Sequence, residues 1–355
     1  MQMKVKIHTS KNINGLQKHL LENGQIFVII DNNLQYLSEH FKQFPVFCFE
    51  FNEQKKTLES VGEIAQWLLD KGADRNALVL GVGGGITTDV TGFTASIYKR
   101  GVKFAFVPTT LLAQVDAAIG GKNGVNFLSY KNILGTINQP EWTYICSDVL
   151  ATLPEDEFKA GIAEVLKTFI LFDKGYYHRA VEYFSAITPK DGQTYGAAAV
   201  GLDEGLLTEI VGKCAEYKGG VVERDEFERG ERRMLNLGHT FAHSIEKLTQ
   251  GKISHGFAVS MGMVIAARFA DALGVAQEGF AAMLINDLRR IGLPALLEDC
   301  PLTAGLEPAD LAEAVGKDKK VTGNNIHFIL PKGLQDVEDV VLPLEKIKEI
   351  ANDLR

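Results

Sequence analysis

The sequence predicts an α/β N-terminal domain with a Rossmann-like parallel sheet, followed by a mostly α-helical C-terminal domain. Three observations lead to this fold class. Short apolar runs alternate with helical patterns in the first part of the chain, and a glycine-rich turn follows one of these runs. Long helical patterns dominate from residue 154 onward. The 355 residues suffice for two domains, which we place at 1–153 and 154–355.

The strands of the predicted sheet are buried apolar runs that follow an opening strand within residues 1–10. These runs are residues 26–31, 45–51, 77–83, 104–108 and 142–148. Residues 57–73 carry apolar side chains at helical spacing, and Thr57 can cap the N-terminus of that helix. This alternation favours a parallel sheet with helices on both faces.

The second domain is predicted to be helical almost throughout. The helical patterns cover residues 155–172, 203–218, 230–249, 255–274, 276–291 and 306–317. Within this domain only residues 325–333 have the character of a strand.

Composition excludes several classes of protein. Hydrophobic residues make up 46% of the chain and charged residues 23%, as in ordinary globular proteins. The net charge of −8 gives no support to a nucleic-acid partner or an anionic membrane. The four cysteines form no CxxC motif, and the N-terminus lacks the apolar core of a signal peptide. We therefore expect a soluble, cytoplasmic protein with reduced thiols.

The segment "GVGGGITTDVTGF" (81–93) follows a predicted strand and leads into a helix, where parallel sheets bind phosphates. It is not the usual dinucleotide motif, because Ile86 occupies the place of the last glycine in GxGxxG. A Walker loop is excluded because Asn123 follows the lysine of "GGKN". A tight turn without a ligand is the alternative. Since four glycines in five residues cost much conformational entropy, we favour a nucleotide site of non-standard kind.

Three histidines and one glutamate suggest a metal site. "LNLGHTFAHSIE" (235–246) places His239 and His243 one helical turn apart, and His255 opens the next apolar stretch. Glu164 lies among apolar residues, and a buried carboxylate requires a metal or a cation. Nitrogen ligands with one carboxylate suit zinc better than magnesium or calcium. Spacing alone pairs His239 with His243. It does not decide whether a histidine binds metal, transfers protons or packs in the core.

Polar residues with apolar neighbours are the remaining candidates. Asp116, Lys122, Lys131 and Asn132 fall in a predicted loop region, where open α/β sheets bind ligands, although a lysine there can also be a surface residue. Lys167 follows Glu164 by three residues, so the two form either a surface ion pair or part of a buried site.

Several long motifs, in the same order, resemble the 3-dehydroquinate synthase family. They are "GGG…D..GF.AS.Y.RG" (83–101), "VPTTLLAQVDAAIGGK" (107–122), "LPEDEFKAGIAEVLK" (153–167), "LNLGHTF.H" (235–243) and "HG" (255–256). The resemblance covers almost the whole chain. It implies a dehydroquinate synthase-like fold, NAD and a divalent metal (zinc, with cobalt as the second choice) as cofactors, a sugar phosphate substrate and a homodimer.

The resemblance also implies a role for individual residues. The metal ligands would be Glu164, His239 and His255. The catalytic residues would be His243, Lys167, Asn236, Lys122 and Asp116. The substrate-binding residues would be Arg100 (from a neighbouring subunit), Asn132, Lys218, Arg232 and Lys319, with Lys320 as the alternative to Lys319. The NAD-binding residues would be Asp31, Asn33, Glu53, Lys56, Gly84, Gly85, Ile86, Asp89, Thr109, Thr110, Lys131 and Thr152.

The reaction implied is a phosphate-eliminating cyclisation of 3-deoxy-D-arabino-heptulosonate 7-phosphate to 3-dehydroquinate in the shikimate pathway. Two departures from the family pattern are Thr88, where many members have glycine, and the pair Asn123–Gly124. The second departure resembles relatives that cyclise sedoheptulose 7-phosphate to valiolone-type products. The alternatives are therefore a valiolone-type cyclase, a metal-dependent polyol dehydrogenase of related fold, and a nucleotide- or metal-binding protein without turnover.

Overall fold

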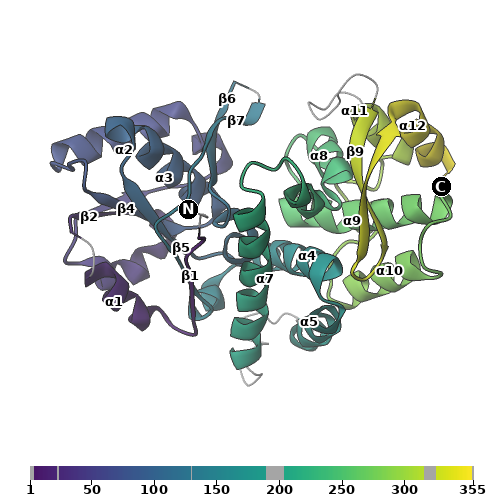
Figure 1. The fold of residues 1–355 in the computed structure, drawn as a ribbon, viewed down its shortest axis with the longest axis horizontal. Helices are drawn as coiled ribbons and strands as arrows, with labels where there is room; N and C mark the ends of the chain where they lie inside the picture. Colours follow the sequence, from purple (N-terminus) through teal and green to yellow (C-terminus); the bar gives the residue numbers. More distant parts are fainter. Residues whose placement is uncertain (1–3, 22–23, 129, 189–203, 316–324, 354–355) are drawn as a thin grey trace. The chain divides into compact units, whose positions relative to one another are not determined.

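The computed structural model describes residues 4–21, 24–128, 130–188, 204–315 and 325–353, which fold into two compact units (Figure 1). The first unit runs to Leu153 and includes helix α7 (Glu204–Arg224) with the chain after it up to Phe227. The second unit begins at Pro154 and resumes at Glu228. The assignment of NAD binding to one part and of metal and substrate binding to the other stays a prediction.

Helix α7 differs from the predicted division, which placed it in the second domain. It packs against strand β1 (Ile7–Ser10) of the first unit. A Cβ on Gly212 would lie 3.3 Å from the Thr9 side chain, and one on Gly219 would lie 3.2 Å from Ile7. Glycines on this face of α7 therefore let the helix approach the strand closely.

The first unit is built on a six-stranded parallel sheet with the order β1-β8-β5-β4-β2-β3. The strands besides β1 are β2 (Ile26–Asp31), β3 (Val46–Phe49), β4 (Leu78–Gly83), β5 (Lys103–Pro108) and β8 (Thr143–Cys146). Each corresponds to a predicted apolar run, and the predicted fold class is confirmed.

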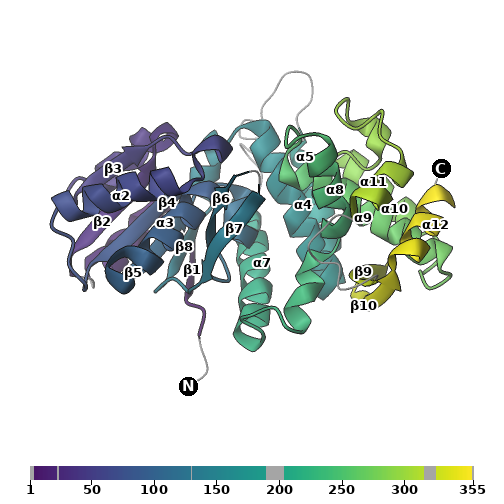
Figure 2. The ribbon, with the colours of Figure 1, turned by 90° about the horizontal axis from the view of Figure 1, so that it is seen from above.

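Helices cover both faces of this sheet (Figure 2). Helices α2 (Leu58–Asp70) and α3 (Gly85–Ile97) pack on one face, and α1 (Leu16–Leu21) with the 3₁₀ segment η2 (Asn32–Phe41) packs on the other. Thr57 caps α2 as predicted, because its hydroxyl accepts the Ser60 N–H at 3.5 Å. The carboxyl ends of the strands consequently lie along one edge of a layered core.

Two strands form an antiparallel hairpin in a region that was expected to be a loop. Its strands are β6 (Lys122–Phe127) and β7 (Tyr130–Ile137). Glycine and asparagine have low strand propensity, and for this reason the sequence did not predict the two strands. Lys122, Lys131 and Asn132 are therefore strand residues, and the expectation of a loop was wrong for them.

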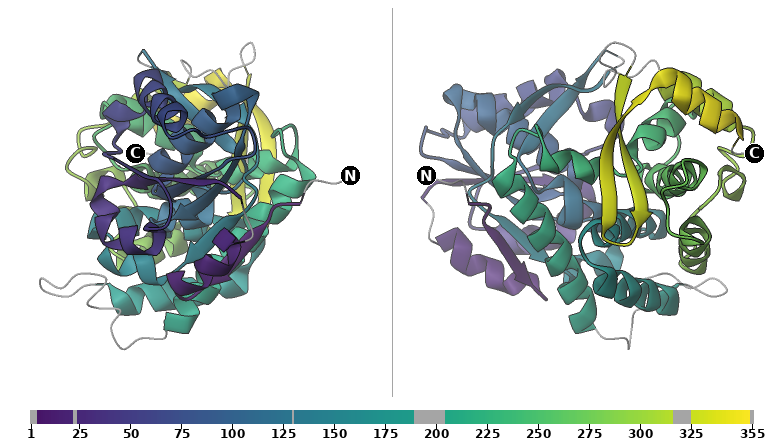
Figure 3. Two further views of the ribbon diagram at one scale, coloured as in Figure 1. Left: turned by 90° about the vertical axis from the view of Figure 1, so that its left-hand side faces the viewer. Right: turned by 45° about the vertical axis from the view of Figure 1, so that its right-hand side comes forward.

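The second unit combines helices with one hairpin. The helices are α4 (Glu155–Phe172), α5 (Lys174–Ile187), α8 (His239–Leu248), α9 (His255–Ala272), α10 (Phe280–Arg290), α11 (Pro308–Val315) and α12 (Leu344–Asp353). The hairpin consists of β9 (Asn325–Gly333) and β10 (Asp336–Pro343), and it packs against α9 (Figure 3). Phe241, Phe269 and Phe328 form the centre of this packing, with ring centroids 5.1–5.5 Å apart.

Among the described residues of this unit, helices α5 and α12 and strand β10 were not predicted. The predicted helix over 230–249 is also interrupted. It consists of a 3₁₀ segment, η7 (Glu231–Asn236), and helix α8, separated by Gly238 with a φ of 78°. No helix among the described residues is long and apolar enough to cross a membrane.

Gly256 allows helices α9 and α4 to cross closely. A Cβ at this position would overlap the backbone of Ala160, one turn before Glu164 on α4. Backbone atoms of a buried helix have little freedom to move away. Gly256 therefore brings the first turn of α9, which contains His255, against the part of α4 that contains Glu164.

The Gly256→Ala substitution should lower the free energy of unfolding by about 3 kcal/mol, because overpacking against a backbone has no easy relief. Urea unfolding measures this change. Gly62→Ala in α2 is the control, since nothing lies within 4 Å of the added Cβ. The control should be neutral or stabilising by up to about 1 kcal/mol. Equal effects of the two substitutions would contradict the proposed close crossing.

Candidate active site and metal centre

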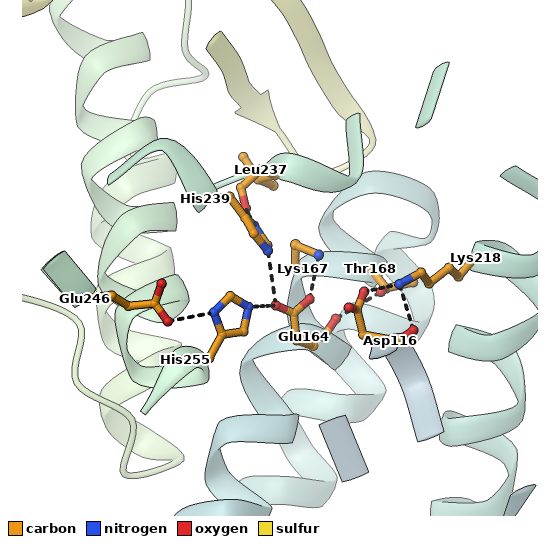
Figure 4. A network of polar contacts seen from close by, with 9 residues as sticks. All are labelled: Asp116, Glu164, Lys167, Thr168, Lys218, Leu237, His239, Glu246 and His255. Carbon is orange, nitrogen blue, oxygen red and sulfur yellow. Dashed lines mark hydrogen bonds and ion pairs between the residues drawn. The ribbon is translucent and has the colours of Figure 1, made fainter. Parts of the chain in front are cut away.

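Glu164, His239 and His255 converge in the second unit (Figure 4). Glu164 Oε1 lies 3.4 Å from His255 Nε2 and 3.7 Å from His239 Nε2. The glutamate comes from the middle of α4, whereas each histidine is the first residue of its helix, α8 or α9. The ligand atoms of the three residues all lie within 4.8 Å of one another.

Both histidines present Nε2 to this point because other groups engage Nδ1. His239 Nδ1 lies 3.1 Å from the Leu237 carbonyl oxygen, and His255 Nδ1 lies 3.2 Å from Glu246 Oε1. A carbonyl and a carboxylate only accept hydrogen bonds, so each imidazole donates through Nδ1. Its Nε2 then carries the lone pair that binds a metal.

Glu246 is a functional candidate that the sequence analysis missed. It lies on α8, seven residues and two turns after His239, within the same motif. The i, i+7 spacing was the signal that could have revealed it. A carboxylate that orients a metal-binding histidine usually increases metal affinity as well.

The residues present fit a divalent cation such as zinc. Two imidazole nitrogens and one carboxylate oxygen form a three-ligand set that leaves a position for substrate or water. Burial opposes protonation of His255, but its hydrogen bonds to Glu164 and Glu246 outweigh that effect and raise its pKa to about 10. The carboxylates of Glu164 and Glu246 thus favour positive charge at His255. A metal ion that displaces the imidazole proton would supply that charge.

Two further candidates adjoin the three ligands. Lys167 is almost fully buried, and its Nζ lies 2.5 Å from Glu164 Oε2. Of the two alternatives for Glu164 and Lys167, a surface ion pair or part of a buried site, the structure shows the buried arrangement. The ring of His243 packs edge-on against that of His239, with centroids 5.7 Å apart, so it lies beside the ligand set without belonging to it.

Segment η7 contains two of the predicted site residues of the second unit, Arg232 for substrate binding and Asn236 for catalysis. The Arg232 side chain is buried, with 3% of the residue exposed. Asn236 Nδ2 donates to Glu228 Oε1 at 2.5 Å, which fixes the orientation of its amide. Lys319 and its alternative Lys320 lie outside the described residues.

In the first unit, Asp116 and Lys218 form one pair. Asp116 lies in the short π-helical segment η5 (Ala113–Ala117), and Lys218 lies on α7. Lys218 Nζ donates to Asp116 Oδ1 at 2.6 Å and to the Asp116 carbonyl oxygen at 2.8 Å (Figure 4). The aspartate therefore holds the ammonium group in a defined place.

The predicted NAD-binding residues gather where the parallel strands end. Asp31 is the last residue of β2, Gly84 and Gly85 join β4 to α3, and Thr109 with Thr110 follows β5. This edge of an open parallel sheet is the usual nucleotide site, and the first turn of α3 has N–H groups without helical partners. A Cβ on Gly84 would lie 3.0 Å from the Thr110 side chain. A larger residue at position 84 would therefore be crowded by Thr110.

Polar contacts order the rest of this edge. Lys56 Nζ lies 2.5 Å from Asp89 Oδ2. Burial raises the pKa of the Asp89 carboxyl, and the charge of Lys56 opposes that effect. The remaining contacts are Asn33 N–H to Asp31 at 2.9 Å, Asn126 to Glu53 at 2.9 Å, Lys131 to Glu53 at 3.9 Å, and Tyr36 to Thr152 at 2.9 Å. Ile86 lies in the first turn of α3.

Lys122, Asn132 and Arg100 occupy exposed positions in the first unit. Asn132 adopts a φ of 49° and its N–H donates to Asn126 Oδ1 at 2.9 Å. Arg100 ends the turn η4 (Tyr98–Arg100) and has a φ of 69°. A left-handed conformation is uncommon outside glycine and is often retained at functional positions.

The two departures from the family pattern have structural explanations. Asn123 is buried, and its Nδ2 donates to the carbonyl oxygens of Gly121 and Asn138, both at 2.9 Å. A Cβ on Gly92 of α3 would overlap this side chain, so Asn123 faces the core of its unit. Thr88 is also buried, and its hydroxyl donates to the Gly85 carbonyl oxygen at 2.9 Å. Both side chains therefore have hydrogen-bond partners inside the first unit.

Comparison with known proteins decides the family. The description "3-dehydroquinate synthase N-terminal" matches residues 46–160, and "3-dehydroquinate synthase C-terminal" matches residues 161–321. The 3-dehydroquinate synthase of Alkaliphilus metalliredigens (strain QYMF) is 37% identical over 340 residues, which cover 94% of this chain and 90% of that protein. This chain belongs to the 3-dehydroquinate synthase family. The resemblance seen in the sequence is confirmed.

Solved structures of other proteins have a fold similar to that of this member of the 3-dehydroquinate synthase family. The 2-epi-5-epi-valiolone synthase of Streptomyces hygroscopicus subsp. jinggangensis 5008, with NAD⁺ and Zn²⁺ bound, has a TM-score of 0.85 and 24% identity, covering 100% of this chain and 97% of that one. A 2-deoxy-scyllo-inosose synthase complexed with carbaglucose-6-phosphate, NAD⁺ and Co²⁺ has a TM-score of 0.79 and 23% identity, covering 98% and 96%. At this identity the likeness shows the fold alone.

The Glu246→Gln substitution should weaken zinc binding roughly tenfold, because it removes the charge that orients and polarises His255. Competition with a chromophoric chelator measures the affinity without reference to activity. Glu349→Gln on α12 is the control, since that carboxylate contacts Lys346 at 2.9 Å. Zinc affinity that is unchanged in Glu246→Gln would show that Glu246 has no part in the metal centre.

The Gly84→Val substitution should abolish measurable NAD binding while the protein stays folded, because bulk at this position blocks backbone approach to a pyrophosphate. Calorimetric titration with NAD measures the loss, and circular dichroism with zinc content serves as the control for folding. A folded variant with the affinity of the wild type would remove this loop from the cofactor site.

Proposed function

We propose that this chain is a working 3-dehydroquinate synthase, which converts 3-deoxy-D-arabino-heptulosonate 7-phosphate to 3-dehydroquinate and phosphate. The observation that carries the proposal is the convergence of Glu164, His239 and His255 in a chain of this family. The reaction is a carbon–oxygen lyase step of the shikimate pathway, on the route to chorismate and the aromatic amino acids.

The cofactors would be held by residues of the chain itself. Glu164, His239 and His255 would bind a divalent metal, zinc or cobalt, and the strand ends of the first unit would bind NAD. Together these groups supply reversible hydride transfer and polarisation of a substrate hydroxyl when they are bound. The oxidation would be temporary, so the overall reaction would eliminate phosphate and close the carbocycle without net consumption of NAD.

The residues around the metal ligands would handle protons and orient the substrate. His243 is the proposed proton-transfer group, because an imidazole can both accept and donate a proton and this one lies beside His239. Lys167 and Asn236 would donate hydrogen bonds to substrate oxygens, since Glu164 and Glu228 fix their positions. Asp116 and Lys122 complete the proposed catalytic set, and Asn132 and Lys319 the proposed substrate-binding set.

Arg232 is the proposed partner of an anionic group on the substrate, with Lys218 as a second cation. A planar guanidinium can donate two parallel hydrogen bonds to a carboxylate. Because Arg232 is buried, a substrate without the matching charge would be penalised by several kcal/mol. This argues for the heptulosonate over sedoheptulose 7-phosphate, which lacks the carboxylate.

The structure gives less support to the alternative functions. The hypothesis of a valiolone-type cyclase depended on Asn123 and Gly124, but the Asn123 side chain is hydrogen-bonded inside its unit. A polyol dehydrogenase would not need buried cations such as Lys167 and Arg232 for an anionic substrate, and it would accumulate NADH. A protein without turnover would leave His243 and Asn236 without a role. The proposal further includes a homodimer, with Arg100 reaching the neighbouring subunit, and a cytoplasmic location.

Phosphate release provides the test. The protein loaded with zinc and NAD should release phosphate from the heptulosonate phosphate at a rate at least about tenfold above that with sedoheptulose 7-phosphate, because the latter has no carboxylate to accept hydrogen bonds from the Arg232 guanidinium. Turnover should require NAD, yet no NADH should accumulate. Equal rates with both sugars would favour the valiolone-type enzyme, and accumulating NADH would favour the dehydrogenase.

A further inference from the structure

The short segment η7 cannot hold its position by itself. It is a 3₁₀ segment of six residues, and isolated helices of this length are unstable in water. Nevertheless its residue Arg232 is buried and must keep one orientation to serve as a substrate-binding group. The position of Arg232 therefore depends on what the neighbouring residues of η7 contact.

Arg233, the next residue, links η7 to the β9–β10 hairpin. Its Nη1 donates to Asp339 Oδ2 at 3.2 Å and lies 3.1 Å from His327 Nδ1. His327 Nδ1 in turn lies 2.9 Å from Asp339 Oδ1, so the three side chains form a closed cluster. Arg233 Nη2 also donates to the carbonyl oxygen of Arg229, two residues before the start of η7.

The hairpin is a suitable anchor because it is itself fixed. Strands β9 and β10 are paired from Asp336 opposite Gly333 to Pro343 opposite Asn325, with one shift of register between Asp336 and Val337. Phe328, next to His327, is buried against Phe241 of α8 and Phe269 of α9. Because the hairpin is packed on α8 and α9, a contact with Asp339 holds η7 in a fixed position relative to these helices.

We propose that Arg233 is a positioning residue for the substrate-binding site, which acts through Arg232 by holding η7 against the β9–β10 hairpin. Adjacent residues of a 3₁₀ segment point about 120° apart. Arg233 can thus face the hairpin while Arg232 faces the interior of its unit. The inference rests on the proposed function, since it takes Arg232 to bind the substrate.

The test compares steady-state kinetics of the wild type, Arg232→Ala, Arg233→Ala and the double variant. Arg233→Ala should raise KM for the heptulosonate phosphate roughly tenfold with little change in kcat, because a misplaced binding group weakens ground state and transition state alike. In the Arg232→Ala background the same substitution should change KM by less than about twofold. A purely structural role would instead give additive effects in both backgrounds.

Two further variants distinguish a local displacement of Arg232 from a general loss of folding. Asp339→Asn keeps the side-chain volume and should also raise KM, whereas Arg233→Lys should recover part of the wild-type value. Arg289→Ala is the matched control, because it removes another arginine–aspartate pair of the second unit, with Asp299 at 2.7 Å, and should leave KM unchanged.

The outcomes separate the two proposals. Wild-type turnover combined with an unchanged KM in Arg233→Ala and Asp339→Asn, or with additive effects, overturns the positioning role alone. Absence of phosphate release by the wild type overturns the proposed function, and the positioning role with it.

Discussion

The burial of one carboxylate is the constraint on which the second unit depends. Glu164 is completely buried in the middle of α4, and an ionised carboxylate in such a place is very unfavourable without compensating charge. Compensation comes from Lys167 one turn along the same helix and from the two imidazoles of His239 and His255. A bound divalent cation would complete it.

This requirement determines how the helices begin and cross. Both histidines are the first residues of their helices, so the positions of two helix starts fix the geometry of the ligands. Gly238, in a left-handed conformation, permits the turn into α8, and Gly256 permits α9 to touch α4. The turn at Gly238 and the close crossing of α9 and α4 at Gly256 thus orient Nε2 of each histidine toward Glu164.

Local patterns in the sequence predicted the strands of the six-stranded parallel sheet and the Thr57 cap, because these depend on neighbouring residues. The apolar flanks of Glu164 likewise indicated a buried carboxylate. Spacing could not choose His255 over His243, since that choice depends on where two helices meet; only the resemblance did so. The contacts of Glu246 and Asp339 depend on tertiary structure, and the glycine-rich hairpin β6–β7 lacked a strand pattern.

X-ray absorption spectroscopy of the zinc-loaded protein, compared with zinc-loaded His255→Ala and His243→Ala, tests the central claim most directly. The account expects two imidazole nitrogens and a carboxylate oxygen at about 2.0–2.2 Å from one zinc ion per chain. His255→Ala should lose one imidazole from this coordination shell, and His243→Ala should keep both. A shell that loses an imidazole in His243→Ala and retains both in His255→Ala would contradict the account.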